Sequence, residues 1–399
     1  MTLAFPAGTA SDEPRSAGRA GTVLSALPNA KLSTGISLAE ALGQLGAKLE
    51  TKLDGDFASL SFTILREQLD QGLKMALEAV VAGPSEAVFN EALQSRRSAA
   101  AAAGTNPSEA RWSVAACALM DPCSPTFMAG IGTEETLVSL SARALRGFYK
   151  ERYNGTGALV IVSGAADSAR LGSLVETALP AGPAAPTDAA WQPRLSTPKV
   201  RVIDAPGEAQ ARLLLVQPLP AGLAADPAPA ELATLTFRQR LMDILRTEKG
   251  WSYEMYPYGN RVGRSGSFLH MNIPIQTDKV ALGIKEVEAE AARLRTAPLS
   301  AGFLATSKGY LQGGLQSALT SLPAMNEQLL EAERGGLPPD YYSRFLRALP
   351  KVSPEQVRAI AETLLAPDRF VWVVAGDAKR VGAALEAEKI PYSVVQPVR

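Results

Sequence analysis

An arginine and a tyrosine seven residues apart, Arg246 and Tyr253, are the side chains whose types and spacing could do chemistry. The segment between them has the pattern of a helix end, a glycine stop at Gly250 and a strand start. Arg246 falls almost opposite the apolar face of that helix, so it does not cover the core. A helix-terminal Arg and a strand-initial Tyr can offer N–H donors and a phenolic O–H to one ligand. The alternative is a surface ion pair for Arg246 and half-buried sheet packing for Tyr253.

The length and composition are typical of a globular protein of two domains. At 399 residues the chain exceeds one ordinary domain. Its 40 basic and 40 acidic side chains cancel, so nothing draws the chain toward nucleic acid or an anionic membrane. No apolar run approaches the ~20 residues that span a bilayer. The first residues lack the basic start and apolar middle of a signal peptide.

The chain has two cysteines and one histidine, so few side chains are available to bind a metal or to act as a nucleophile. A disulfide between Cys117 and Cys123 is geometrically possible, but two free buried thiols are the favoured interpretation. His270 falls in an alternating segment that predicts a strand, where a structural role is favoured over a catalytic one. A self-sufficient enzyme with a different chemistry is disfavoured, because neither a Ser–His nor a Cys–His pair is expected.

The second half of the chain repeats the pattern of the first. Residues 141–146 before 160–164 are echoed by 353–358 before 372–376, at an offset of 212 residues. A long internal repeat indicates two similar domains. We therefore expect an α+β fold of two homologous domains, each a largely antiparallel sheet packed with helices. The expected domains are residues 1–182 and 200–399, joined by a Pro-rich linker at 183–199.

Several short motifs, spread over nearly the whole chain, resemble those of the pitrilysin/insulinase family of zinc peptidases. The resemblance is to the short form of the family that includes mitochondrial processing peptidase. The motifs are Phe5-Pro6-Ala7-Gly8, Asp12-Glu13-Pro14, Ala17-Gly18, Gly132-Thr133-Glu134-Glu135, Phe148-Tyr149, Tyr153, Val162-Ser163-Gly164 and the Leu245–Tyr253 segment. Family members usually begin with an additional strand or hairpin before the Phe5 segment. We therefore expect either a trimmed first domain or a start that lies further upstream, where a signal peptide would also fall.

The resemblance implies an inverted zinc motif, His-x-x-Glu-His, on the helix after Ala17-Gly18, with a further Glu ligand downstream. In active members two imidazoles and a carboxylate hold the zinc, and the motif's Glu is the general base. Here the two histidines and the base are replaced by Gly21, Ser25 and Leu24, and the downstream Glu falls in or beside 99–103, a run of alanines. We expect no metal and no cofactor in this chain, which by itself cannot be the zinc hydrolase.

The Arg–Tyr pair is retained. In the family, the C-terminal domain contributes such a pair across a closed cleft, where it binds substrate backbone and helps to stabilise the tetrahedral intermediate. Arg246 and Tyr253 match these positions, so the resemblance implies the non-catalytic subunit of a heterodimeric zinc metallopeptidase. A homologous His-x-x-Glu-His subunit would hold the zinc, while this chain closes the cleft on an unfolded peptide and lends Arg246 and Tyr253 in trans.

The alternative is a structural or interaction subunit of a larger complex, with no role in proteolysis. Two locations remain open at this point. The periplasm is expected if an upstream signal is missing from this start, and the cytoplasm otherwise.

Overall fold

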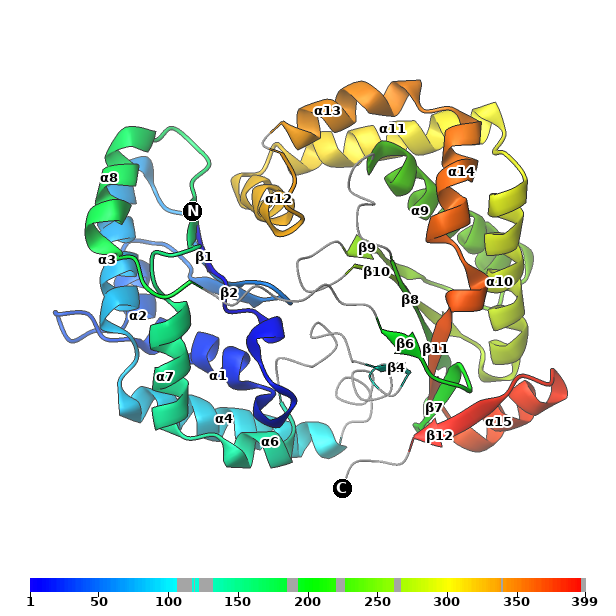
Figure 1. The fold of residues 1–399 in the computed structure, drawn as a ribbon, viewed down its shortest axis with the longest axis horizontal. Helices are drawn as coiled ribbons and strands as arrows, with labels where there is room; N and C mark the ends of the chain where they lie inside the picture. The colour runs from blue at the N-terminus through cyan, green and yellow to red at the C-terminus, as the bar shows by residue number, and fades with distance from the viewer. Residues whose placement is uncertain are drawn as a thin grey trace. The chain divides into compact units, whose positions relative to one another are not determined.

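The computed structural model describes residues 1–105, 117, 119–121, 132–184, 193–219, 227–261, 267–338 and 340–395. The chain forms two compact units (Figure 1). Unit 1 contains Met1–Thr105, Met128–Ala189 and Ser317–Arg334, and unit 2 contains Asn106–Phe127, Ala190–Gln316 and Gly335–Arg399. Each half of the chain therefore contributes one short segment to the unit that the other half mostly builds.

Unit 1 is built on a four-stranded antiparallel sheet with the order β2-β3-β1-β5. Its strands are β1 (Thr2–Phe5), β2 (Glu50–Leu53), β3 (Ala58–Ser61) and β5 (Leu159–Ile161). Its helices are α1 (Arg19–Ala26), α2 (Leu38–Gln44), α3 (Leu69–Ala82), α4 (Glu86–Thr105), α6 (Glu134–Ser139), α7 (Ala142–Arg152), α8 (Ser168–Ala178) and α12 (Leu322–Arg334).

The two faces of this sheet have different partners, because successive side chains of a strand point to opposite faces. Leu3 and Phe5 of β1 pack into the large cluster formed with the helices of the first half of the chain. Ala4 faces the other way and packs with Phe57 and with Leu330 of α12. A helix from the second half of the chain therefore completes the core of unit 1.

Unit 2 is built on a six-stranded mixed sheet with the order β12-β7-β11-β8-β10-β9. Its strands are β7 (Val200–Asp204), β8 (Ala211–Pro218), β9 (Tyr256–Arg261), β10 (Phe268–Ile275), β11 (Val371–Gly376) and β12 (Tyr392–Val395), beside a short pair of β4 (Met120–Asp121) and β6 (Arg194–Leu195). Its helices are α9 (Pro227–Met242), α10 (Val280–Thr296), α11 (Ala301–Ala318), α13 (Tyr341–Ala348), α14 (Pro354–Leu364) and α15 (Ala378–Ala387).

The strand order of unit 1 recurs in unit 2. The run β9-β10-β8-β11 repeats β2-β3-β1-β5, and helices α7 and α14 begin at Ala142 and Pro354, at the offset that the sequence repeat predicts. The predicted α+β class with two similar domains is thereby confirmed. The unit 2 sheet adds β7, which pairs in parallel with both β11 and β12, so this sheet is mixed rather than wholly antiparallel.

One face of the unit 2 sheet is covered by helices. Leu213 and Leu215 of β8 and Ile273 of β10 are fully buried in the cluster that includes residues of α9, α10 and α14. On the opposite face, the β4 and β6 pair lies over Val216 of β8 and Val373 of β11. The parts of β8 and β10 nearer Ala211 and Ile275 are more open on this second face, and the candidate site lies there.

The structure decides two interpretations of single residues. Cys117 is disulfide-bonded, so the interpretation of two free thiols is wrong; Cys123 lies outside the described residues. The chain has one other cysteine, Cys123, six residues further along the sequence. His270 lies within β10, as predicted, with its ring centroid 5.4 Å from that of Phe268.

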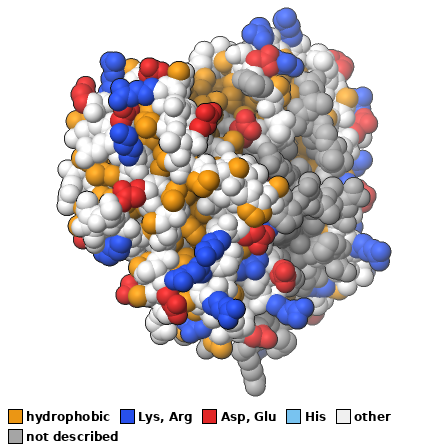
Figure 2. Space-filling view, turned by 60° about the vertical axis from the view of Figure 1, so that its left-hand side comes forward, with side chains coloured by type: hydrophobic (Ala, Val, Ile, Leu, Met, Phe, Trp, Pro, Cys, Tyr) orange, Lys and Arg blue, Asp and Glu red, His pale blue; other side chains and the backbone are white. Residues whose placement is uncertain are grey.

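Acidic and basic side chains are interspersed on the face that Figure 2 shows, as the zero net charge leads us to expect. Within the described ranges, no helix is both long and apolar enough to cross a bilayer.

Asn326 is a buried polar link between α12 and the unit 1 sheet, and its removal should destabilise the fold. Its side chain is 2% exposed, accepts a hydrogen bond from Ser163 Oγ at 2.7 Å and donates one to Thr2 Oγ1 at 3.2 Å. Asn326→Ala leaves both hydroxyls without this partner, so we expect a loss of about 1–3 kcal/mol in unfolding free energy, measured by urea denaturation. Glu333→Ala, at an exposed position of the same helix, is the control. Equal stability of the two variants would contradict this role for Asn326.

Candidate functional site

Arg246 stacks on Tyr253. Helix α9 continues directly into a π-helical turn, Asp243–Glu248, where Leu245 is fully buried and Arg246 is exposed. The Arg246 Cζ lies 5.0 Å from the centroid of the Tyr253 ring. Among the described residues, Arg246 has no ion pair and its guanidinium donates no hydrogen bond. The guanidinium edge therefore keeps its N–H donors for another group, because stacking occupies only the guanidinium face.

The Tyr253 side chain is exposed to solvent and is not packed in the sheet. Its side chain is 74% exposed, which does not fit half-buried sheet packing. The prediction that a strand begins at Tyr253 is wrong, because β9 begins at Tyr256. The chain first makes a turn at Gly250, whose φ of 64° confirms the predicted left-handed cap.

Gln276, directly after the end of β10, donates two hydrogen bonds to this turn. The backbone N–H of Gln276 donates to the carbonyl oxygen of Trp251 at 3.0 Å, and its Nε2 donates to that of Gly250 at 3.0 Å. Ser252, 4% exposed, donates from its Oγ to the carbonyl oxygen of Glu254 at 3.0 Å. Tyr253 is therefore presented by a backbone that is fixed on both sides.

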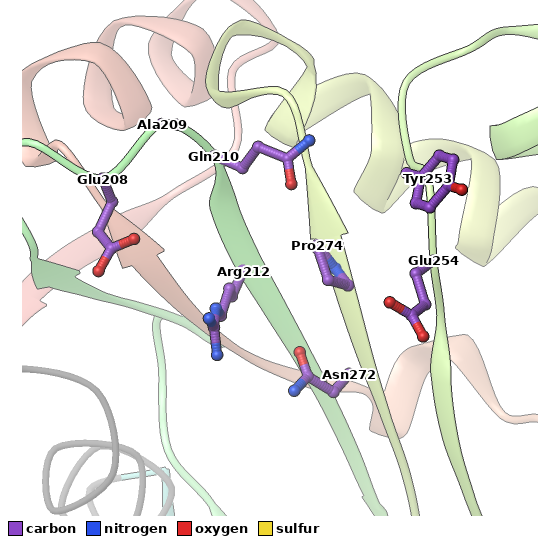
Figure 3. Close-up of a pocket in the computed structure, with 8 residues that line it drawn as sticks. All are labelled: Glu208, Ala209, Gln210, Arg212, Tyr253, Glu254, Asn272 and Pro274. Atoms are coloured by element: carbon purple, nitrogen blue, oxygen red, sulfur yellow. The ribbon is translucent and has the colours of Figure 1, made fainter.

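A pocket of about 560 Å³ lies beside Tyr253, wholly within unit 2 (Figure 3). Its lining is polar, with one aromatic ring and no large aliphatic side chain: Glu208, Ala209, Gln210, Arg212, Tyr253, Glu254, Asn272 and Pro274. The sequence pattern did not single out Arg212 or Asn272. A signal was present, because both are polar residues at outward-facing positions of largely apolar strands.

The positions that the resemblance aligns with the zinc motif lie on α1, and their residues do not fit a metal. Gly21 has no side chain, Leu24 is 4% exposed and carries no ligand atom, and the Ser25 hydroxyl donates to the carbonyl oxygen of Thr22 at 2.8 Å. The alanine run 99–103 lies within α4, which packs on α1. No group of three or more His, Cys, Asp or Glu side chains in the described part of the chain is placed to hold a metal ion.

A carboxylate fixes the start of α1. Asp12 accepts hydrogen bonds from the backbone N–H of Gly18 and of Ala20, each at 3.0 Å, and lies 3.5 Å from Arg19 Nε. Burial raises the pKa of Asp12 to about 6, although these hydrogen bonds and Arg19 act in the opposite direction.

Comparison with known proteins finds one matching family model and several solved structures of similar fold. The model of the peptidase M16 inactive domain matches residues 139–308. A peptidase M16 inactive domain from Pseudomonas fluorescens superposes with a TM-score of 0.78 at 21% identity, covering 94% of this chain and 92% of that one. The resemblance to the pitrilysin (M16) family is confirmed.

Further M16-like folds match over similar lengths. The first half of the periplasmic protease PqqL from Escherichia coli has a TM-score of 0.69 at 16% identity, with 97% of this chain and 90% of that one covered. A chain of complex III2 from Candida albicans has a TM-score of 0.77 at 14% identity, with 98% and 94% covered. No curated protein sequence matches the chain. The match to an inactive M16 domain, together with the residues at 21, 24 and 25, supports a non-catalytic member of the pitrilysin family.

The buried carboxyl at the start of α1 predicts a pH dependence of stability. The pKa of Asp12 is about 6 in the folded chain against an ordinary value of 3.8, so the folded chain holds this proton more tightly. The resulting stabilisation is complete below about pH 4 and is lost as the pH rises through 6, by about 3 kcal/mol in unfolding free energy. Asp12→Asn removes this titration. Relative to Asp12→Asn, the wild type should lose stability between pH 4 and 7 in urea denaturation. A difference between the two proteins that does not change with pH would contradict the prediction.

Proposed function

We propose that this chain is the non-catalytic subunit of a heterodimeric zinc metallopeptidase. It closes the peptide-binding cleft and supplies Arg246 and Tyr253 to the substrate and to the tetrahedral intermediate at the zinc of a partner subunit. The partner is a homologous peptidase that carries His-x-x-Glu-His, and the substrate is an unfolded peptide. The observation that carries the proposal is the exposed Arg246–Tyr253 stack, whose donors have no other ion-pair or hydrogen-bond partner among the described residues.

The chemistry of the two side chains supports this role. When a water attacks a peptide carbonyl, negative charge develops on the carbonyl oxygen. A guanidinium N–H and a phenolic O–H are the donors that stabilise such an oxyanion, and one well-placed donor is worth ~3–4 kcal/mol in acyl-transfer sites. The stack fixes the direction of the guanidinium, and the Gln276 hydrogen bonds fix the turn that carries Tyr253. Donors held in place before the reaction cost little reorganisation during it.

A structural or interaction subunit without a role in proteolysis is the second candidate. It is supported by the similarity in fold to a chain of complex III2. It does not account for an arginine and a tyrosine that are both exposed and that contact each other.

Substitution of either donor should reduce turnover of the complex without affecting its assembly. We expect Arg246→Ala and Tyr253→Phe each to lower kcat by about 10²-fold, because each removes one donor to the oxyanion. Both side chains are exposed, so folding and association should be unchanged. The measurement is chelator-sensitive hydrolysis of an unstructured peptide by the purified complex.

The chain offers a matched control. Arg238 stacks on Tyr310 at 5.7 Å, on helices α9 and α11 and outside the pocket. Arg238→Ala and Tyr310→Phe should therefore leave kcat unchanged. Wild-type turnover by Arg246→Ala and Tyr253→Phe would rule out the assisting role.

A further inference from the structure

Two pocket residues, Arg212 and Asn272, are not used by the oxyanion role of Arg246 and Tyr253. Both lie on the face of the unit 2 sheet opposite the helical core, between buried neighbours such as Leu213 and Ile273. Their side chains extend from β8 and β10 toward the same space in Figure 3. Asn272 follows His270 on this face of β10, so the strand carries two polar side chains here, whereas Arg212 is the polar residue of β8 at this end of the face.

The register places the two side chains as diagonal neighbours. Arg212 is opposite Pro274, and Asn272 is opposite Leu214. Diagonal neighbours in an antiparallel pair lie ~7–8 Å apart, which the long side chain of Arg212 can reduce. The pairing of β10 with β9 ends at Asn272, opposite Tyr256. Two residues later, Pro274 has no N–H with which to pair, so the pocket opens where the two strands separate.

The hydrogen-bonding capacity of the pair is unused. The Oδ1 of Asn272 is inaccessible to solvent and accepts no hydrogen bond from any described residue. Arg212 is exposed and forms no ion pair within the same described set. A buried acceptor without a donor destabilises the folded chain, so this oxygen can gain from an N–H group.

One acceptor beside one strong donor complements a peptide group. In an extended chain the N–H and C=O of one residue point to the same side, as they do in an antiparallel ladder. A rotation of the Asn272 carboxamide toward the pocket, which this residue lines, lets Oδ1 accept from that N–H while the Arg212 guanidinium donates to that C=O. A free anion fits less well, because Glu208 and Glu254 also line the pocket and leave it with one more negative than positive side chain.

We propose that Arg212 and Asn272 bind the main chain of an extended peptide next to Tyr253. The pocket then recognises the peptide groups of the substrate and not the identity of its side chains. This inference rests on the proposed peptide-binding role of the chain. It adds two residues that hold the substrate, and it makes this subunit a peptide-binding protein by itself. The cost of leaving Asn272 without a donor in the free protein is then recovered when a peptide binds.

The test is equilibrium binding of short fluorescein-labelled peptides to the full chain alone, measured by fluorescence anisotropy. Two unstructured peptides of unrelated sequence are used, together with a version of each whose backbone N–H groups are methylated. We expect Arg212→Ala and Asn272→Leu to weaken binding of both unmodified peptides about tenfold, since each removes one hydrogen bond. Arg347→Ala, an exposed arginine on α13 outside the pocket, should bind as the wild type does.

The methylated peptides and a stability measurement make the assignment specific. Methylation should weaken binding to the wild type but not further weaken binding to Asn272→Leu, because the acceptor is already absent. Asn272→Leu should also unfold at the same or a higher urea concentration, because it removes a buried acceptor that has no partner. Loss of binding through misfolding would instead lower that concentration.

Three results would overturn the proposal. They are wild-type binding by Arg212→Ala and Asn272→Leu, a loss that depends on the sequence of the peptide, and no peptide binding by the wild-type chain. Arg246 and Tyr253 are intact throughout, and turnover by the complex is not measured. A failure here is therefore separate from a failure of the oxyanion role, which the kcat of the complex reports.

Discussion

The contact between Arg246 and Tyr253 depends on one backbone constraint, the left-handed turn at Gly250. Its φ of 64° reverses the chain after the π-helical turn, and a side chain there would cost roughly 1–2 kcal/mol although the space around it is open. Gln276 then ties the next residues to the end of β10. The same turn brings Tyr253 to the wall of the pocket whose floor carries Arg212 and Asn272. One short segment therefore exposes the Tyr253 ring, allows the Arg246 guanidinium to stack on it and contributes to the shape of the pocket.

Unit 1 keeps its fold although Gly21, Leu24 and Ser25 of α1 offer neither an imidazole nor a carboxylate. Helix α1 is buried beside α4, and its start is fixed by Asp12 and not by groups that bind a metal. Across the sheet, Asn326 and Leu330 of α12 hold a helix of the second half of the chain against β1. The cap at the start of α1 and the packing of α12 on the sheet therefore stabilise this fold. This scaffold therefore accommodates Gly21, Leu24 and Ser25 on α1, none of which is a His or a Glu.

The sequence predicts the architecture well because its repeat has a fixed offset and its strands have clear periods. Helices α7 and α14 and strands β5 and β11 lie where the offset of 212 residues places them. The exchange of α12 into unit 1 is not predictable in this way, since its contacts with Thr2 and Ser163 join residues far apart in the chain. At the site, the spacing predicts the Arg246–Tyr253 contact and the cap at Gly250. Local patterns do not specify strand register. Three features depend on it: the π-helical turn, the start of β9 at Tyr256 and the pocket at Arg212.

The central claim is that this chain completes an active site that it cannot form by itself. The most direct measurement is co-expression with a homologous His-x-x-Glu-His subunit from the same source, followed by the mass of the purified complex and its hydrolysis of an unstructured peptide with and without a chelator. The account predicts a mixed assembly that cleaves the peptide, whereas neither chain does so alone. An absence of association, or an association that brings no gain in cleavage, would contradict it.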